Sequence, residues 1–137
     1  MIGSSAEIQK LVFDTLKGNA SIMALANGVY DKVPTSPFGS KTAYISFGPE
    51  DAQEEDAECV RSQRLTLQID IWSRAVGFVE CKKLTNLVRQ ALHEQPLDLT
   101  ENALLQVRVE LSRVFRDPDG ETSHGVIQAT FTVEEPD

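Results

Sequence analysis

The chain has 137 residues, of which 41% are hydrophobic and 25% are charged, a composition typical of one globular domain that needs no metal or disulfide to hold a core. Its net charge of −8 opposes attraction to nucleic-acid phosphates, and no apolar run approaches the roughly 18 residues of a membrane helix. We therefore expect a single domain over residues 1–137, with no bound nucleic acid and no membrane segment. The start of the sequence lacks the features of a secretory signal, so we expect the protein to assemble in the cytoplasm.

Two helical segments are predicted at the beginning of the chain. Ser4 and Glu7 have the spacing of a capping box, and the apolar residues that follow recur at helical intervals, which predicts a helix over residues 5–17. A short helical turn is expected over residues 21–25. The segment over residues 29–40 contains two prolines and a glycine and is predicted to be a long surface loop.

The middle of the chain is predicted to contain two strands and a helix. A strand is expected over residues 43–47, ended by Gly48 and Pro49, and another over residues 64–72, where apolar and polar residues alternate. Apolar residues at helical spacing predict an amphipathic helix over residues 78–93.

A cluster of acidic residues lies between these two strands, over residues 50–58. One interpretation is a solvated, mobile loop. The alternative is a negative surface that faces DNA in transit or a basic partner. Glu54, Glu55 and Asp56 are then the candidate residues of a lumen through which the DNA passes, or of a docking site.

The last third of the chain predicts a long hairpin, with strands over residues 105–115 and 124–133 joined by a turn at residues 116–120. Leu105, Val107, Val109 and Leu111 are expected to share one face of the first strand. Together the segments predict an α+β fold: a two-layer domain with a mainly antiparallel sheet of about four strands, two main helices on one face and a long C-terminal hairpin.

No metal, cofactor or catalytic site is expected. The two cysteines, Cys59 and Cys81, and the two histidines, His93 and His124, do not have the spacing of metal ligands. Asp117 and Asp119 resemble part of a calcium loop, but a tight strand connection explains them more simply. His124 could form an acid–base pair with either aspartate, yet no nucleophile accompanies it. A small α+β enzyme therefore remains the minor alternative, and it would require a pocket that holds His124 and an acid.

The terminal hairpin and the loop over residues 34–40 are the candidate contact surfaces, because strands at a sheet edge can be extended by a neighbouring subunit. The candidate residues for a subunit or partner interface are Phe38, Arg113, Arg116, Asp117, Asp119, His124 and Phe131.

The order of several segments resembles the tail terminator, or tail-completion, family of long-tailed phages and gene transfer agents. The resemblance covers about residues 7–134, and the segments that carry it are VYDKVP at 29–34, AYISFG at 43–48, LQIDIWS at 67–73, FRDPDG at 115–120 and HG at 124–125. It implies a head-tail joining protein without cofactor or catalytic residues, located in the virion or virion-like particle.

The resemblance also implies a mode of action. Such a protein is expected to form a homo-oligomeric, hexameric ring at the head-proximal end of a long non-contractile tail and to stop polymerisation of the tube. Its expected partners are the tail tube protein and a head-tail connector or stopper protein, and DNA passes through the ring without specific binding. The alternative within the same junction is a head-side stopper or adaptor.

Overall fold

The computed structural model describes residues 3–55 and 61–136 of the chain. Three helices and five strands follow in the order α1 (Ser4–Lys17), α2 (Ala20–Leu25), β1 (Ala26–Tyr30), β2 (Ala43–Glu54), β3 (Arg61–Ser73), α3 (Val79–Leu92), β4 (Ala103–Arg116) and β5 (Ser123–Glu135). The strands form one sheet in the order β1-β2-β3-β5-β4, in which only β1 and β2 are parallel.

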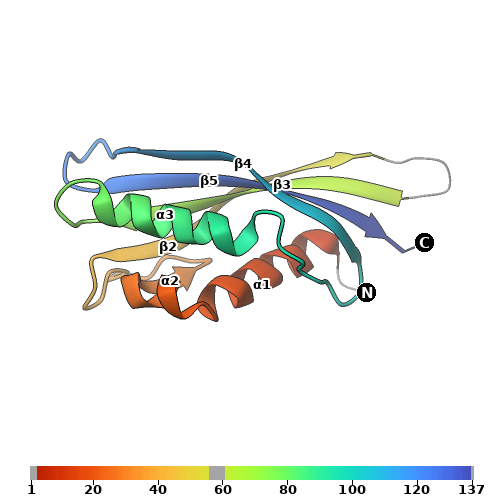
Figure 1. Ribbon diagram of the computed structural model, residues 1–137, viewed down its shortest axis with the longest axis horizontal. Helices are drawn as coiled ribbons and strands as arrows, with labels where there is room; N and C mark the ends of the chain where they lie inside the picture. Colours follow the sequence, from red (N-terminus) through yellow and green to blue (C-terminus); the bar gives the residue numbers. More distant parts are fainter. Residues whose placement is uncertain (1–2, 56–60, 137) are drawn as a thin grey trace.

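The helices all lie on one side of the sheet, and its other side is open (Figure 1). This arrangement confirms the predicted two-layer α+β fold with a long C-terminal hairpin. The far ends of β2 and β3 extend beyond the helices, so this part of the sheet projects from the body of the domain (Figure 1).

The structure adds a fifth strand to the four that were predicted. Residues 29 and 30 were assigned to a loop, but β1 ends at Tyr30 and pairs in parallel with the first residues of β2. Val29 is 4% exposed, which shows that burial against α1 and α2 stabilises a strand too short for its sequence pattern to reveal.

Strand β2 was predicted to end at Gly48 and Pro49, but it continues past both residues. A bulge between Phe47 and Glu50 accommodates one extra residue, and pairing with β3 continues to Glu54. Pro49 is tolerated there because no strand among the described residues pairs with the outer side of this part of β2, so its missing N–H removes no ladder bond. The described part of the acidic segment is therefore mostly strand, whereas its residues 56–58 lie outside the described residues.

The core lies between the helices and the inner faces of β3 and β5. Leu65 pairs with Phe131 and Ile69 pairs with Ile127, and all four side chains are fully buried. The alternation predicted for β3 is thus confirmed, and β5 has the same pattern, with Ile127, Ala129, Phe131 and Val133 buried. However, Phe131 was also predicted as an interface residue, and that prediction is wrong, because its ring is part of the core of the subunit.

Strand β4 departs from the predicted alternation because it contains two bulges, one between Leu104 and Gln106 and one between Val109 and Leu111. Each bulge adds a residue to β4 and reverses which face the following side chains occupy. Leu105 is 58% exposed as a result. The expectation that Leu105 and Leu111 share a buried face with Val107 is therefore wrong.

Glu7 connects α1 to the segment that precedes β4 instead of forming the predicted capping box. Gly3 is the N-cap of α1 and makes no side-chain cap bond. The buried Glu7 carboxylate accepts hydrogen bonds of 2.8–3.1 Å from the backbone N–H groups of Thr100, Glu101 and Asn102, and another from the Asn102 side chain. Burial acts to raise the pKa of Glu7, but these four bonds outweigh burial and lower it.

Helix α3 approaches β5 most closely at Gly125. A Cβ atom at this position would lie 2.3 Å from Thr85 Oγ1, 3.2 Å from Ile71 Cβ and 3.3 Å from Cys81 Sγ. Only glycine fits here without displacing the helix, since Thr85 and Cys81 are both buried.

We predict that Gly125→Ala lowers the free energy of unfolding by about 1–3 kcal/mol, the usual cost of overpacking a core. Urea denaturation measures the change. Thr85→Ala removes the closest atom, so Gly125→Ala should cost less in a Thr85→Ala background, as a double-mutant cycle reveals. Equal costs in the two backgrounds would show that the contact with Thr85 does not determine the packing.

We also predict that Glu7→Gln destabilises the protein at neutral pH by about 1.5–3 kcal/mol, because an amide cannot accept all the bonds that the carboxylate accepts. The pKa of Glu7 is lower in the folded state than in the unfolded chain. Its stabilising effect is therefore complete above the unfolded pKa and is lost as the pH falls through the folded pKa. Urea denaturation at pH 7 and at about pH 3 should show the gap between wild type and variant narrowing in acid. Asp98→Asn, on the exposed surface of the same connector, is the control and should show no such gap.

Candidate functional site

A row of aromatic rings crosses one end of the open face of the sheet. Tyr44 on β2 lies 6.2 Å from Trp72 on β3, Trp72 stacks at 3.8 Å on His124 of β5, and His124 lies 4.9 Å from Phe115 on β4. Phe38, in the loop after β1, contacts Tyr44 edge-to-face at 4.8 Å. This aromatic row is half-buried, and stacked rings of this kind fix the neighbouring strands relative to one another.

His124 is held by a carboxylate that the sequence analysis did not pair with it. His124 Nε2 lies 2.7 Å from Asp70 Oδ1, and the two side chains are only 14% and 10% exposed. The expected partners, Asp117 and Asp119, lie in the turn between β4 and β5 instead. Asp70 and Trp72 belong to the polar face that the alternation of β3 predicted, so the position of Asp70 was available from the sequence, but its pairing with β5 was not.

The turn residues have a local structural role. Asp119 accepts hydrogen bonds from the backbone N–H groups of Glu121 and Thr122 and from the Thr122 hydroxyl. These bonds lower the pKa of Asp119, and the bond from the Thr122 side chain has the largest effect. Gly120 follows with a φ of 77°, which explains the glycine. This is the tight strand connection that the sequence analysis preferred to a calcium loop.

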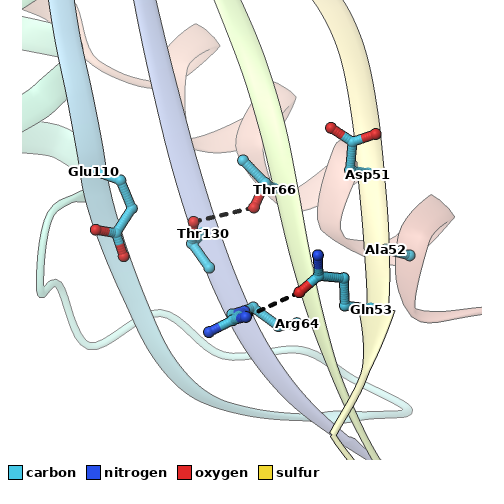
Figure 2. A pocket seen from close by; sticks show the side chains of 7 residues that line it. All are labelled: Asp51, Ala52, Gln53, Arg64, Thr66, Glu110 and Thr130. Atoms are coloured by element: carbon cyan, nitrogen blue, oxygen red, sulfur yellow. Dashed lines mark hydrogen bonds between the residues drawn. The ribbon is translucent and has the colours of Figure 1, made fainter.

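A polar hollow of about 560 Å³ lies at the other end of the open face, on the projecting part of the sheet (Figure 2). Arg64 donates a hydrogen bond of 2.9 Å to Gln53, and the hydroxyls of Thr66 and Thr130 lie 3.2 Å apart across the hollow. Its other lining residues are Asp51, Ala52 and Glu110. The hollow is shallow and carries charges of both signs, which suits contact with a polar partner.

The described residues offer little support for a catalytic role. Cys81 is buried, and burial raises the pKa of its thiol, which disfavours the reactive thiolate. Within residues 3–55 and 61–136, no group of three or more histidine, cysteine, aspartate or glutamate side chains is placed to hold a metal ion. No helix in the part of the chain that the structure describes is long and apolar enough to span a membrane.

Three other candidate interface residues, Phe38, Arg113 and Arg116, lie at least partly at the surface. Phe38 lies beneath the Arg74 guanidinium at 4.4 Å. Arg113 and Arg116 are exposed on β4, where Arg116 lies 4.5 Å above the ring of Phe78. Glu55, one of the acidic candidates for the lumen or a docking site, forms an ion pair of 3.1 Å with Arg64.

The acidic candidates lie at the projecting end of the sheet, distant from the aromatic row. Glu54 is the last residue of β2 and Glu55 follows it, and both are exposed, whereas Asp56 lies outside the described residues. The structure therefore separates the sequence-derived candidates into an aromatic end and an acidic end. Tyr44 and Phe115 also lie at the aromatic end, although they were not among the predicted candidates. The alternation of their strands was the sequence signal that could have placed them on the open face.

Comparison with known proteins gives one consistent result. The sequence profile of the family described as tail completion protein gp17 matches residues 10–134. The tail completion protein gp17 of Bacillus phage SPP1 is 22% identical over 131 residues, which cover 95% of this chain and 94% of the phage protein. A chain from the virion of a native gene transfer agent particle has the same fold, with a TM-score of 0.86, 24% identity and coverage of 98% of this chain and 99% of that chain.

The family profile spans nearly all of the described strands and helices, and it agrees with the resemblance seen in the segment order. The chain belongs to the tail completion protein gp17 family, whose members are structural components of virion tails.

Proposed function

We propose that the protein is a tail terminator, which forms a ring on the head-proximal end of a tail tube, stops its polymerisation and presents a docking surface to the head connector. The observation that carries the proposal is the family match over residues 10–134. The fold shared with a chain of a gene transfer agent virion supports it.

The architecture suits a ring. A closed ring of identical subunits requires two different surfaces on each subunit, because one surface must contact the other surface of the next copy. Here β4 forms one edge of the sheet, and the part of β2 beyond Ser46 forms an edge on the opposite side. The open face between them (Figure 1) presents the polar hollow (Figure 2) to a partner or to the lumen, together with the aromatic row.

The charge of the protein suits the passage of DNA. A net charge of −8 repels phosphates and allows DNA to slide without sticking. The acidic residues of the projecting end, Glu50, Asp51, Glu54 and Glu55, are all exposed. We assign Glu54 and Glu55, together with the neighbouring Asp56 of the sequence, to the lumen or to a docking site for an adjacent junction protein.

A structural role also explains the polar cluster around His124 better than catalysis does. Asp70 accepts a second hydrogen bond, of 3.0 Å, from Gln68, and Trp72 Nε1 donates a bond of 3.0 Å to Ser46. The Trp72–Ser46 bond links β3 to β2, and the Asp70–His124 contact links β3 to β5 across the open face. We therefore assign Asp70 and His124 to the rigidity of a docking surface and not to acid–base chemistry.

Deletion of the gene from its particle system should yield overlong tails without heads, because nothing then ends polymerisation of the tube. Electron microscopy of purified tails measures their lengths, and complementation by the wild-type gene is the control. Tails of normal length that lack heads would instead assign the protein to a head-side stopper or adaptor. Normal, DNA-delivering particles would contradict both roles.

Neutralisation of the acidic end, by Glu54→Gln, Glu55→Gln and Asp56→Asn together, should reduce DNA delivery severalfold, because Arg61 and Arg64 remain beside the neutral residues and attract phosphates. Delivery per assembled particle is the measurement. The matched control is Asp14→Asn, Asp31→Asn and Asp98→Asn, which changes the net charge equally at exposed positions elsewhere. If the two variants deliver DNA equally well, the acidic residues of the projecting end have no specific role in DNA delivery.

A further inference from the structure

The two edges of the sheet differ in which residues remain available for pairing. On β2, residues 43–46 are covered by β1, but residues 50–54 have no neighbouring strand on their outer side among the residues that the structure describes. All five are exposed. A projecting strand with an open row of backbone N–H and C=O groups is a template for another strand.

The edge formed by β4 is covered in its middle and open beyond it. Glu94 N donates a hydrogen bond of 2.9 Å to Val107 O, and Val109 N donates one of 2.9 Å to His93 Nδ1. The connector after α3 therefore occupies the outer edge of β4 at residues 107–109. Past the bulge, residues 111–116 have no strand beside them on the outer side within the described chain.

The charges of the two open stretches are opposite. Residues 50–54 of β2 contain Glu50, Asp51 and Glu54, whereas residues 111–116 of β4 contain Arg113 and Arg116. Arg108, in the covered part of β4, already pairs with Glu94 at 2.9 Å. Arg113 and Asp51 are both exposed, and each lies on the open face of the sheet, since they pair with Val126 and Thr66 of the neighbouring strands.

The directions of the strands are also compatible. Pairing is antiparallel at each step from β2 through β3 and β5 to β4, so β4 runs opposite to β2. A second copy beside the first in a ring, rotated about an axis that makes an acute angle with the strands, keeps their general direction and would therefore place its β4 antiparallel to β2. Residues opposite each other in such a pair must lie on the same face, which leaves Asp51 or Gln53 opposite Arg113.

These two registers require the copies to be staggered along the strands. Asp51 and Gln53 are level with Thr66 and Arg64 of β3, whereas Arg113 is level, through Val126, with Asp70. The stagger is thus four to six residues, roughly 13–20 Å at about 3.4 Å per residue. Across four strands about 4.8 Å apart, this stagger tilts the strands by roughly 35–47° from the rotation axis, close to the 35–45° of closed sheets.

The geometry points to a strand-to-strand contact between copies of this chain, in which residues 50–54 of β2 in one subunit pair antiparallel with residues 111–116 of β4 in the next. The inference rests on the proposed ring and names its contact. The acidic and basic side chains set the order of the subunits, because the opposite charges meet only in the head-to-tail arrangement.

Disulfide cross-linking in assembled tails tests the contact. Two variants, Asp51→Cys with Arg113→Cys and Gln53→Cys with Arg113→Cys, are introduced in a Cys59→Ser background. Opposed residues of an antiparallel pair have Cα atoms about 4.5–5.5 Å apart, within the range of a disulfide. Oxidation should convert most of the protein into covalent multimers with one of the two pairs. The control is Asp98→Cys with Arg113→Cys, which moves one cysteine to an exposed connector. In this variant, oxidation should leave the protein without covalent multimers.

Charge exchange provides a second measurement if the cysteine variants fail to assemble. Asp51→Arg alone and Arg113→Asp alone should each reduce the yield of normal particles at least tenfold, and the double variant, which has the wild-type net charge, should restore it. Normal tails without cross-links, or a double variant no better than the single ones, would overturn the contact while leaving the terminator role intact. Normal tails after deletion of the gene would overturn the terminator role itself.

Discussion

The pairing of β3 with β5 is the interaction on which the rest of the structure depends. These strands remain in register from Arg61 and Glu135 to Ser73 and Ser123, and their inner side chains form most of the sheet's contribution to the core beneath the helices. Because side chains alternate along a strand, this register determines both faces at once. It places Leu65 and Phe131 in the core and stacks Trp72 on His124 outside it.

Covering only one face of the sheet has functional consequences. A domain of this kind retains an open face and two edges, and each can be used in assembly without any change in the core. The side chains on the open face are bonded to each other, as Asp70 and His124 show, so the surface is rigid before a partner arrives. Preorganisation of this kind reduces the entropic cost of binding, which suits the proposed terminator, since it would add once to a growing tail.

The sequence predicted the parts of the fold that depend on long periodic patterns. The alternation of β3 and β5 and the amphipathic face of α3 were sufficient to place them, since their buried residues repeat without interruption. The sequence did not predict β1, whose five residues are stabilised by burial, or the continuation of β2 through Pro49, which depends on a bulge. Bulges also misled the prediction for Leu105. The turn that contains Asp119 was predicted correctly, but the partner of His124 comes from a distant strand.

The central claim is that this fold closes into a ring at the head-proximal end of the tail. Cryo-electron microscopy of that end, at a resolution that separates strands, tests it most directly. If the proposed ring exists, the map should show one ring of this chain with a continuous sheet between subunits. Neighbouring strands from different copies should lie about 4.8 Å apart. A single copy, or a ring whose subunits touch only through α1 and α3, would contradict it.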